Sequence, residues 1–267
     1  MADRRFDIRR MPGATAIAMA CFAMLYIPMI ILLVNSFNDG KVIGQWEGVS
    51  LRWYGTALAN DAFRAAAVNS LILATVAAIV ATAAATLAAL ATTRNASFRG
   101  EGAVFAILNQ PLVVPEIVIA VALLIVIGQL KMVTGYTGLG WLILAHSSFC
   151  IPFAYMPIRA RLEGMDTALE AAGADLYGSR FYVFRRVTLP LLAPGIIAGF
   201  MLAFVVSLDD VVISAFLKSP GQDTLPTYLM GELRRNLSSE IYAISSILLM
   251  ISVVIVAASW LLSRQRN

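Results

Sequence analysis

Six long apolar stretches, almost free of charged residues, constrain the fold of this chain more than any other feature. They cover residues 11–38, 65–93, 102–130, 132–158, 187–217 and 241–263. Each stretch is long enough for a helix to cross a bilayer, which takes about 20 residues. Only 13% of the whole chain is charged, against roughly 25% in an average soluble domain. The sequence therefore predicts an all-α membrane protein with six transmembrane helices. The unbroken runs exclude a β-barrel, which would show short alternating segments.

We expect a single transmembrane domain over residues 1–267. The predicted helices cover approximately residues 12–37, 65–92, 102–130, 136–158, 188–217 and 241–263. The first apolar stretch is longer than the apolar core of a signal peptide, about 7–15 residues, and leads to no small-residue cleavage site. We expect it to be a retained helix.

The basic residues predict the orientation. If the N-terminus is cytoplasmic, thirteen of the 20 Lys and Arg residues fall on the inner side, Arg94 among them, and seven fall outside. Cytoplasmic loops carry such an excess. An even number of spans then places both termini in the cytoplasm.

The largest inner segment, residues 159–190, alternates charged residues with apolar ones at helical spacing. Leu162, Met165, Leu169 and Leu176 lie on this pattern, followed by Phe181. This spacing predicts two amphipathic helices. They would lie on the membrane surface or dock a cytoplasmic partner.

Three acidic residues, Glu116, Asp209 and Asp210, interrupt the apolar stretches. Glu116 follows Pro115, and Pro111 lies four residues earlier, so the third helix is predicted to kink or open there. No Lys or Arg lies in a span to neutralise these acids. Charges inside a membrane are costly and usually mark a ligand site or a pathway. The acids would either line the path of a cationic substrate, or cap helix breaks and pair with a partner subunit.

Motifs for catalysis are missing from the sequence. It holds no GxxxxGK[ST] phosphate loop, no GxSxG and no HExxH. His146 is the only histidine, so we interpret it as a packing or hydrogen-bonding residue, and Cys21 and Cys150 as packing residues. An aspartyl hydrolase built on Asp209 and Asp210 is disfavoured, because adjacent helix residues point about 100° apart and a carboxylate dyad needs facing groups. We expect no catalytic residue and no metal site.

The loop between the fourth and fifth helices resembles the Glu-Ala-Ala loop of permease subunits of binding-protein-dependent ABC importers. The motif begins at Glu170 and ends at Leu189-Pro190. The resemblance implies a type I importer permease fold, with a cytoplasmic coupling helix in loop 159–190 that fits a groove on the ATPase. The residues that it assigns to coupling are Glu170, Ala171, Ala172, Gly173, Asp175, Leu176, Tyr177, Gly178 and Ser179. The chain departs from the family pattern at Ala171, where the family has Glu, and at Tyr177, where it has Gly.

Further segments resemble the spermidine/putrescine branch of this family. They are Tyr26-Ile27-Pro28-Met29, Arg52-Trp53-Tyr54, residues 111–116, Leu144-Ala145-His146 and, above all, Ser207-Leu208-Asp209-Asp210. The resemblance implies a bacterial inner-membrane permease subunit for putrescine or spermidine, with Glu116, Asp209 and Asp210 in the substrate pathway.

The implied partners are a second permease subunit in a heterodimer, two ATP-binding subunits and a periplasmic substrate-binding protein. The chain itself would hold no cofactor, because ATP and Mg²⁺ would be bound by the ATPase subunits. Two alternatives stay open. One is an ABC permease for another solute, such as an amino acid, an opine or iron(III), and the other is a proton-coupled secondary transporter.

Overall fold

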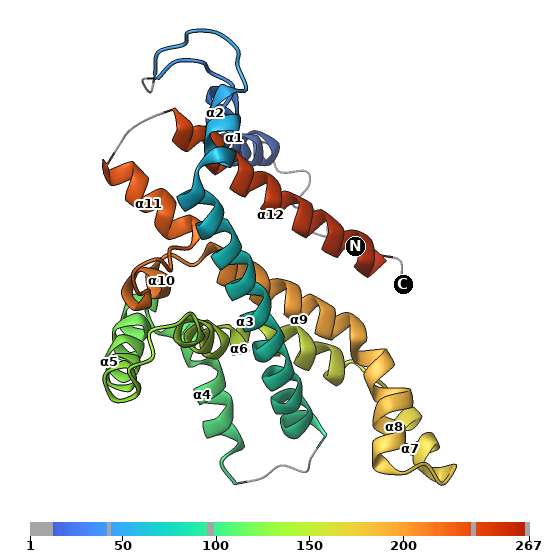
Figure 1. The fold of residues 1–267 in the computed structure, drawn as a ribbon. Helices are drawn as coiled ribbons and strands as arrows, with labels where there is room; N and C mark the ends of the chain where they lie inside the picture. Colours follow the sequence, from blue (N-terminus) through green and yellow to red (C-terminus); the bar gives the residue numbers. More distant parts are fainter. Residues whose placement is uncertain (1–12, 42–43, 95–98, 236–238, 265–267) are drawn as a thin grey trace. The chain divides into compact units, whose positions relative to one another are not determined.

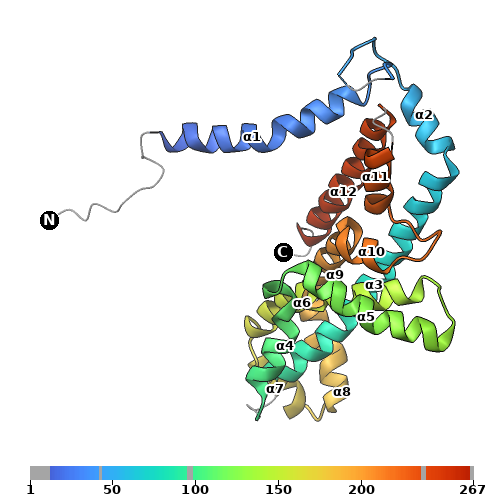
Figure 2. The same cartoon turned by 90° about the vertical axis from the view of Figure 1, so that its left-hand side faces the viewer.

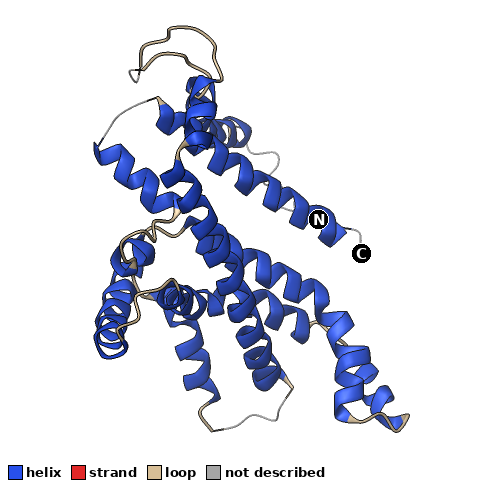
Figure 3. Ribbon diagram, viewed as in Figure 1, coloured by secondary structure: helices blue, strands red, loops and turns tan. Residues whose placement is uncertain are grey.

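The computed structural model describes residues 13–41, 44–94, 99–235 and 239–264, and these residues form helices and loops (Figure 3). Their one element of β pairing is an isolated bridge between Asn38 and Val49. The predicted all-α fold is confirmed. The helices are α1 (Ala14–Asn35), α2 (Arg52–Ala59), α3 (Asp61–Thr93), α4 (Glu101–Val113), α5 (Glu116–Thr134), α6 (Gly140–Glu163), α7 (Ala168–Asp175), α8 (Arg180–Val183), the π-helix η2 (Phe184–Thr188), α9 (Leu189–Asp209), α10 (Val212–Leu217), α11 (Leu225–Arg235) and α12 (Glu240–Arg264).

Five of the six predicted spans correspond to helices that are long and apolar enough to cross a membrane: α1, α3, α5, α6 and the continuous segment Arg180–Asp209. The sixth prediction corresponds to α12, whose apolar part within the described residues is the shorter stretch Glu240–Val254. The count of six spans is therefore not fully confirmed.

Two of the predicted helices are broken. The third predicted helix divides into α4 and α5, because Pro115 lacks a backbone N–H and Val114 before it adopts an extended conformation (ψ 135°). The fifth divides into α9 and α10 at Asp210, which is also extended (ψ 127°). The fourth runs on beyond its predicted end at residue 158, where an Arg159–Glu163 ion pair (2.7 Å) spans one turn of α6.

The chain divides into two compact units, residues 1–60 with 231–250 and residues 61–230 with 251–267. The single domain expected over residues 1–267 stays a prediction.

The core of the second unit is a packing of α3, α6 and α9, which Figures 1 and 2 show as crossing helices. Small residues allow close approach between helices in a membrane. Ala74, Ala78, Ala81 and Ala85 of α3 are fully buried. A Cβ atom at Gly199 of α9 would lie only 2.8 Å from a backbone oxygen of α6. In the same unit α4 packs against α6, and α5 packs against α10.

The first unit holds a loop that is organised by one buried amide. Asn38 Nδ2 donates to the backbone oxygen of Gln45 (2.6 Å), and Asn38 Oδ1 accepts from the backbone N–H groups of Gly40 and Glu47. The hydroxyl group of Tyr54 joins those of Ser36 (2.7 Å) and Ser246 (2.8 Å). These bonds satisfy the buried polar groups of a loop that has no regular secondary structure.

Candidate functional site

The three intramembrane acids come together around one cavity of about 420 Å³, which we call the acid cavity. It lies where α5, α6, α9 and the residues after α9 meet. Its lining residues are Glu116, Phe149, Phe153, Val205, Val206, Asp209, Asp210, Val211 and Val212. Carboxyl groups thus share the cavity with apolar and aromatic walls, which suits a ligand with both cationic and apolar parts.

The helix breaks place the acids at this cavity. Glu116 is the first residue of α5, directly after Pro115, and Asp209 is the last residue of α9. Asp210 occupies the break before α10. A continuous helix would point Asp209 and Asp210 about 100° apart. The extended backbone at Asp210 instead lets both neighbours line the same cavity.

Asp210 has a structural role at the end of this break. Its side chain is 1% exposed. Its Oδ1 accepts a hydrogen bond from the backbone N–H of Ile213 (3.2 Å), and its Oδ2 accepts one from Ser214 (2.8 Å). These N–H groups belong to the first turn of α10 and have no partner within the helix. Asp210 therefore caps α10, as the sequence analysis allowed for these acids.

His146 of α6 forms hydrogen bonds to residues on both sides of the same break. Its ring is fully buried. Nδ1 hydrogen bonds with the hydroxyl group of Ser207 (2.9 Å), Nε2 bonds with that of Ser214 (3.1 Å), and Nε2 lies 3.4 Å from Asp210 Oδ2. The hydrogen-bonding role expected for His146 is confirmed. The sequence analysis missed Ser214 as its partner, because nothing in the sequence pairs these two positions.

Asp209 and Glu116 differ from Asp210 in that they remain accessible. Asp209 is exposed and Glu116 is partly exposed. In the part of the chain that the structure describes, no Lys or Arg side chain forms an ion pair with either residue. The same residues include no group of three or more His, Cys, Asp and Glu that could hold a metal ion.

The predicted coupling segment, residues 170–179, is joined to a distant residue by an ion pair. Glu170 of α7 pairs with Arg94, which directly follows α3 (Nε to Oε2, 3.0 Å). The hydroxyl group of Thr188 in η2 also donates to Glu170 (3.0 Å). We call these three residues the coupling corner. Arg94 was predicted only as one of the basic residues of an inner loop, so its pairing with Glu170 is new.

The remaining predicted coupling residues form the end of α7 and a turn. The backbone N–H of Gly178 bonds to the oxygen of Gly173 (3.2 Å), and that of Tyr177 bonds to Ala174 (3.0 Å). This pattern is a Schellman motif, which needs a left-handed residue and usually has glycine there. Here Tyr177 takes that conformation (φ 60°). Ser179 then caps α8 by accepting from the backbone N–H of Tyr182 (3.3 Å).

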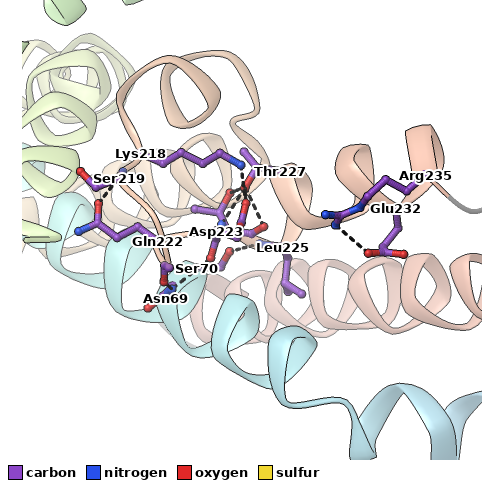
Figure 4. A network of polar contacts seen from close by, with 12 residues as sticks. Asn69, Ser70, Lys218, Ser219, Gln222, Asp223, Leu225, Thr227, Glu232 and Arg235 are labelled. Carbon is purple, nitrogen blue, oxygen red and sulfur yellow. Dashed lines mark hydrogen bonds and ion pairs between the residues drawn. The ribbon is translucent and has the colours of Figure 1, made fainter.

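A third polar cluster, shown in Figure 4, ties the loop between α10 and α11 to α3. Ser70 accepts from the backbone N–H of Leu225 (2.7 Å), and Asn69 donates to the backbone oxygen of Asp223 (3.1 Å). Lys218 pairs with Asp223 inside the same loop. The sequence analysis did not identify Asn69 or Ser70, which look like ordinary polar residues within an apolar helix.

Comparisons with known proteins concern the chain as a whole. Residues 81–265 match the family described as binding-protein-dependent transport system inner membrane component. The chain is 37% identical over 248 residues to the spermidine/putrescine transport system permease protein PotC of Escherichia coli strain K12, covering 93% of this chain and 92% of the relative. It is 35% identical to the putrescine transport system permease protein PotI of the same strain, covering 90% and 86%.

Solved structures support the fold. A bacterial ABC transporter involved in the import of the acidic polysaccharide alginate matches with a TM-score of 0.74 at 19% identity, covering 94% of each chain. The MetNI methionine ABC transporter, in inward-facing conformations, matches with a TM-score of 0.61 at 16% identity, covering 74% of this chain and 93% of the other. At these identities the likeness concerns the fold alone.

Proposed function

This chain belongs to the family of inner membrane components of binding-protein-dependent transport systems, and on that premise we propose that it is the permease subunit of an ATP-driven polyamine importer. The observation that carries the proposal is the acid cavity, where Glu116 and Asp209 have no cationic partner among the described residues. Unpaired carboxylates in an apolar setting are costly unless a cation accompanies them. A polyamine supplies such cations.

The walls of the cavity fit the rest of a polyamine. Putrescine and spermidine are chains of methylene groups between ammonium groups. Phe149, Phe153 and Val206 provide apolar surface for the methylenes and aromatic faces for the cations. We infer that Glu116 and Asp209 hold the ammonium groups briefly during passage. Asp210 lines the same wall while it caps α10.

The coupling segment would receive the force that drives transport. Beyond α7, Leu176 is 82% exposed, Tyr177 100% and Phe181 70%. Exposed apolar side chains gathered on one segment mark an interaction site. We propose that this segment docks an ATP-binding subunit. Closure of two such subunits on ATP would then move the helices between outward-open and inward-open states.

The proposed assembly has this chain as half of the pathway, paired with a second permease subunit. Two ATP-binding subunits would bind ATP and Mg²⁺ on the cytoplasmic side, and a periplasmic binding protein would deliver the substrate. The chain itself would conduct rather than catalyse. Both of its termini would be cytoplasmic, a placement that concerns residues 1–12 and 265–267, outside the described residues.

Uptake of labelled putrescine and spermidine tests the proposal, in cells that lack their own polyamine importers. The cells would express the neighbouring transporter genes with this chain, without it, or with an ATPase subunit that binds but does not hydrolyse ATP. We expect uptake only when both the chain and a working ATPase are present. Uptake that survives the inactive ATPase would indicate a secondary transporter. An assembled complex without any polyamine uptake would overturn the polyamine assignment.

A further inference from the structure

The coupling corner joins three segments that are far apart in the sequence. Arg94 continues α3, since its backbone N–H still bonds to Leu90 (3.0 Å). Glu170 lies in the first turn of α7 and Thr188 lies at the end of η2, and Glu170 contacts both Arg94 and Thr188. The side chains of Arg94 and Glu170 are only 19% and 20% exposed. Such a partly buried, hydrogen-bonded pair is held more firmly than a surface pair.

The ion pair matters because α7 otherwise packs against α8 and η2, and the pair joins it to Arg94 at the end of α3. No residue of α7 is buried. The helices approach closely at Gly173, where an added Cβ would lie 3.3 Å from Val183 of α8 and 3.6 Å from Val187 of η2. The guanidinium group of Arg94 has a further buried nitrogen, Nη2, that finds no hydrogen-bond partner. Among the described residues, Glu170 is thus the acid that balances the positive charge of Arg94.

Of the three core helices, α3 is built to move as one piece. Its 33 residues contain no proline and no glycine, whereas α6 contains Pro152 and Pro157, and α9 contains Pro194. Prolines are the usual sites where helices kink. From Asn69 to Arg94 an α-helix rises about 37 Å. At the other end of this distance, Asn69 donates to the backbone oxygen of Asp223 and Ser70 accepts from the backbone N–H of Leu225.

We propose that α3 carries the movement of the coupling helix α7 across the membrane, and that Arg94 is the residue by which α3 follows α7. The inference rests on the proposed function, because α7 moves only if an ATPase docks on the coupling segment. Arg94 and Glu170 are positioning residues, since neither is placed to touch substrate or ATP. A push or tilt of α7 passes through the ion pair to α3 and reaches the loop that Asn69 and Ser70 hold.

The test uses the complete transporter in proteoliposomes, with partner permease, ATPase subunits and binding protein. Stimulation of ATPase activity by the loaded binding protein is compared for wild type, Arg94→Glu, Glu170→Arg and the double variant that exchanges the two charges. Each single reversal is expected to lower stimulation at least about tenfold, which corresponds to 1.4 kcal/mol of lost coupling. The exchange should restore stimulation to within about threefold of wild type, because it rebuilds the pair.

Arg64→Glu is the matched control. Arg64 lies near the other end of α3 and pairs with Asp61 in a solvent-exposed setting. Its reversal changes the charge of the same helix by the same amount and is expected to leave stimulation unchanged. Glu170→Gln is a milder variant that keeps an acceptor for Thr188 and removes only the charge. We expect it to lower stimulation about threefold, which corresponds to a loss of less than about 1 kcal/mol of coupling free energy.

The outcomes separate this inference from the proposed function. A wild-type complex that binds no ATPase subunit, or shows no stimulation, would overturn the proposed function. Normal stimulation in wild type and in assembled single reversals would overturn only the role of Arg94. The inference also fails if the single reversals abolish stimulation and the exchange restores none of it, because the two residues would then act separately. If reversals prevent assembly, wild-type stimulation in Glu170→Gln would contradict the inference.

Discussion

The acid cavity and the coupling corner both contain carboxylates near the ends of helices, but they balance these charges in opposite ways. At the coupling corner, Glu170 pairs with Arg94 at 3.0 Å and accepts from Thr188. At the acid cavity, Glu116 and Asp209 form no ion pair with any Lys or Arg that the structure describes. A carboxylate paired with a cation inside the protein serves the structure, whereas one without a cationic partner is available to a cationic ligand.

The same contrast recurs between neighbouring residues of the acid cavity. Asp210 is buried, caps α10 and lies 3.4 Å from His146. Asp209 is exposed to the cavity, and no hydrogen bond within the described residues involves its side chain. The two residues are chemically identical, so the difference arises entirely from the turn of the backbone between α9 and α10. This contrast predicts that substitutions at the two positions fail for different reasons.

The largest effect is expected from removing both available charges, in the double variant Glu116→Gln with Asp209→Asn. Each carboxylate would contribute about 1.5 kcal/mol through a charge-assisted hydrogen bond to an ammonium group. Losing both corresponds to a fall of about 100-fold in polyamine uptake at low substrate concentration. The measurement is initial uptake of labelled spermidine by cells with matched amounts of assembled transporter.

Asp61→Asn provides the control for this variant. It neutralises an exposed acid at the start of α3 that already pairs with Arg64. We expect uptake close to that of wild type. If the double variant transports as well as this control, the unpaired acids do not act on the substrate, and the contrast between the two regions loses its functional meaning.

The sequence identified the acids and the coupling loop because both signals are local. A charge inside an apolar run stands out, and Pro115 beside Glu116 indicated a kink in the third helix. The break at Asp210 was only one of two alternatives left open for the acids, since no proline or glycine marks it. The apolar runs located the spans well, yet helix ends shifted where amphipathic turns continue an apolar helix, as at Arg159 and Glu163.

The roles of individual residues could not be predicted, because they depend on contacts between distant segments. His146 and Ser214 are 68 positions apart, and Arg94 and Glu170 are 76 apart. With one sequence, nothing links such positions before the helices pack. Arg94 counted only toward the inner excess of basic residues, and Asp209 and Asp210 were interchangeable members of one acidic pair. The roles of these residues become distinct only when the helices pack. The comparisons support the family but assign no role to any of these residues.

A smaller effect, on stability rather than on transport chemistry, is expected for Asp210→Ala. The variant removes the cap of α10, which costs about 1–2 kcal/mol, and leaves the N–H groups of Ile213 and Ser214 without their acceptor. Asp210→Asn keeps one of the two oxygen acceptors and should retain part of this stability. Thermal unfolding of the purified transporter in detergent would compare the two variants. Equal midpoints for Asp210→Ala and wild type would refute the capping role.

The smallest effect is expected at Tyr177, which adopts a left-handed conformation that costs a non-glycine residue about 1–2 kcal/mol. Tyr177→Gly should raise the stability of the coupling segment by about 1 kcal/mol, because glycine takes this conformation freely. Tyr177→Ala also removes the exposed ring but keeps the strain, so it should give no such gain. Hydrogen exchange of the amides of α7 and α8 measures the difference locally. Equal protection in the two variants would mean that the turn carries no strain. A gain in protection in Tyr177→Gly alone, together with weaker ATPase binding in both variants, would indicate that the ring serves docking. The strain in the turn would then be the cost of presenting this ring.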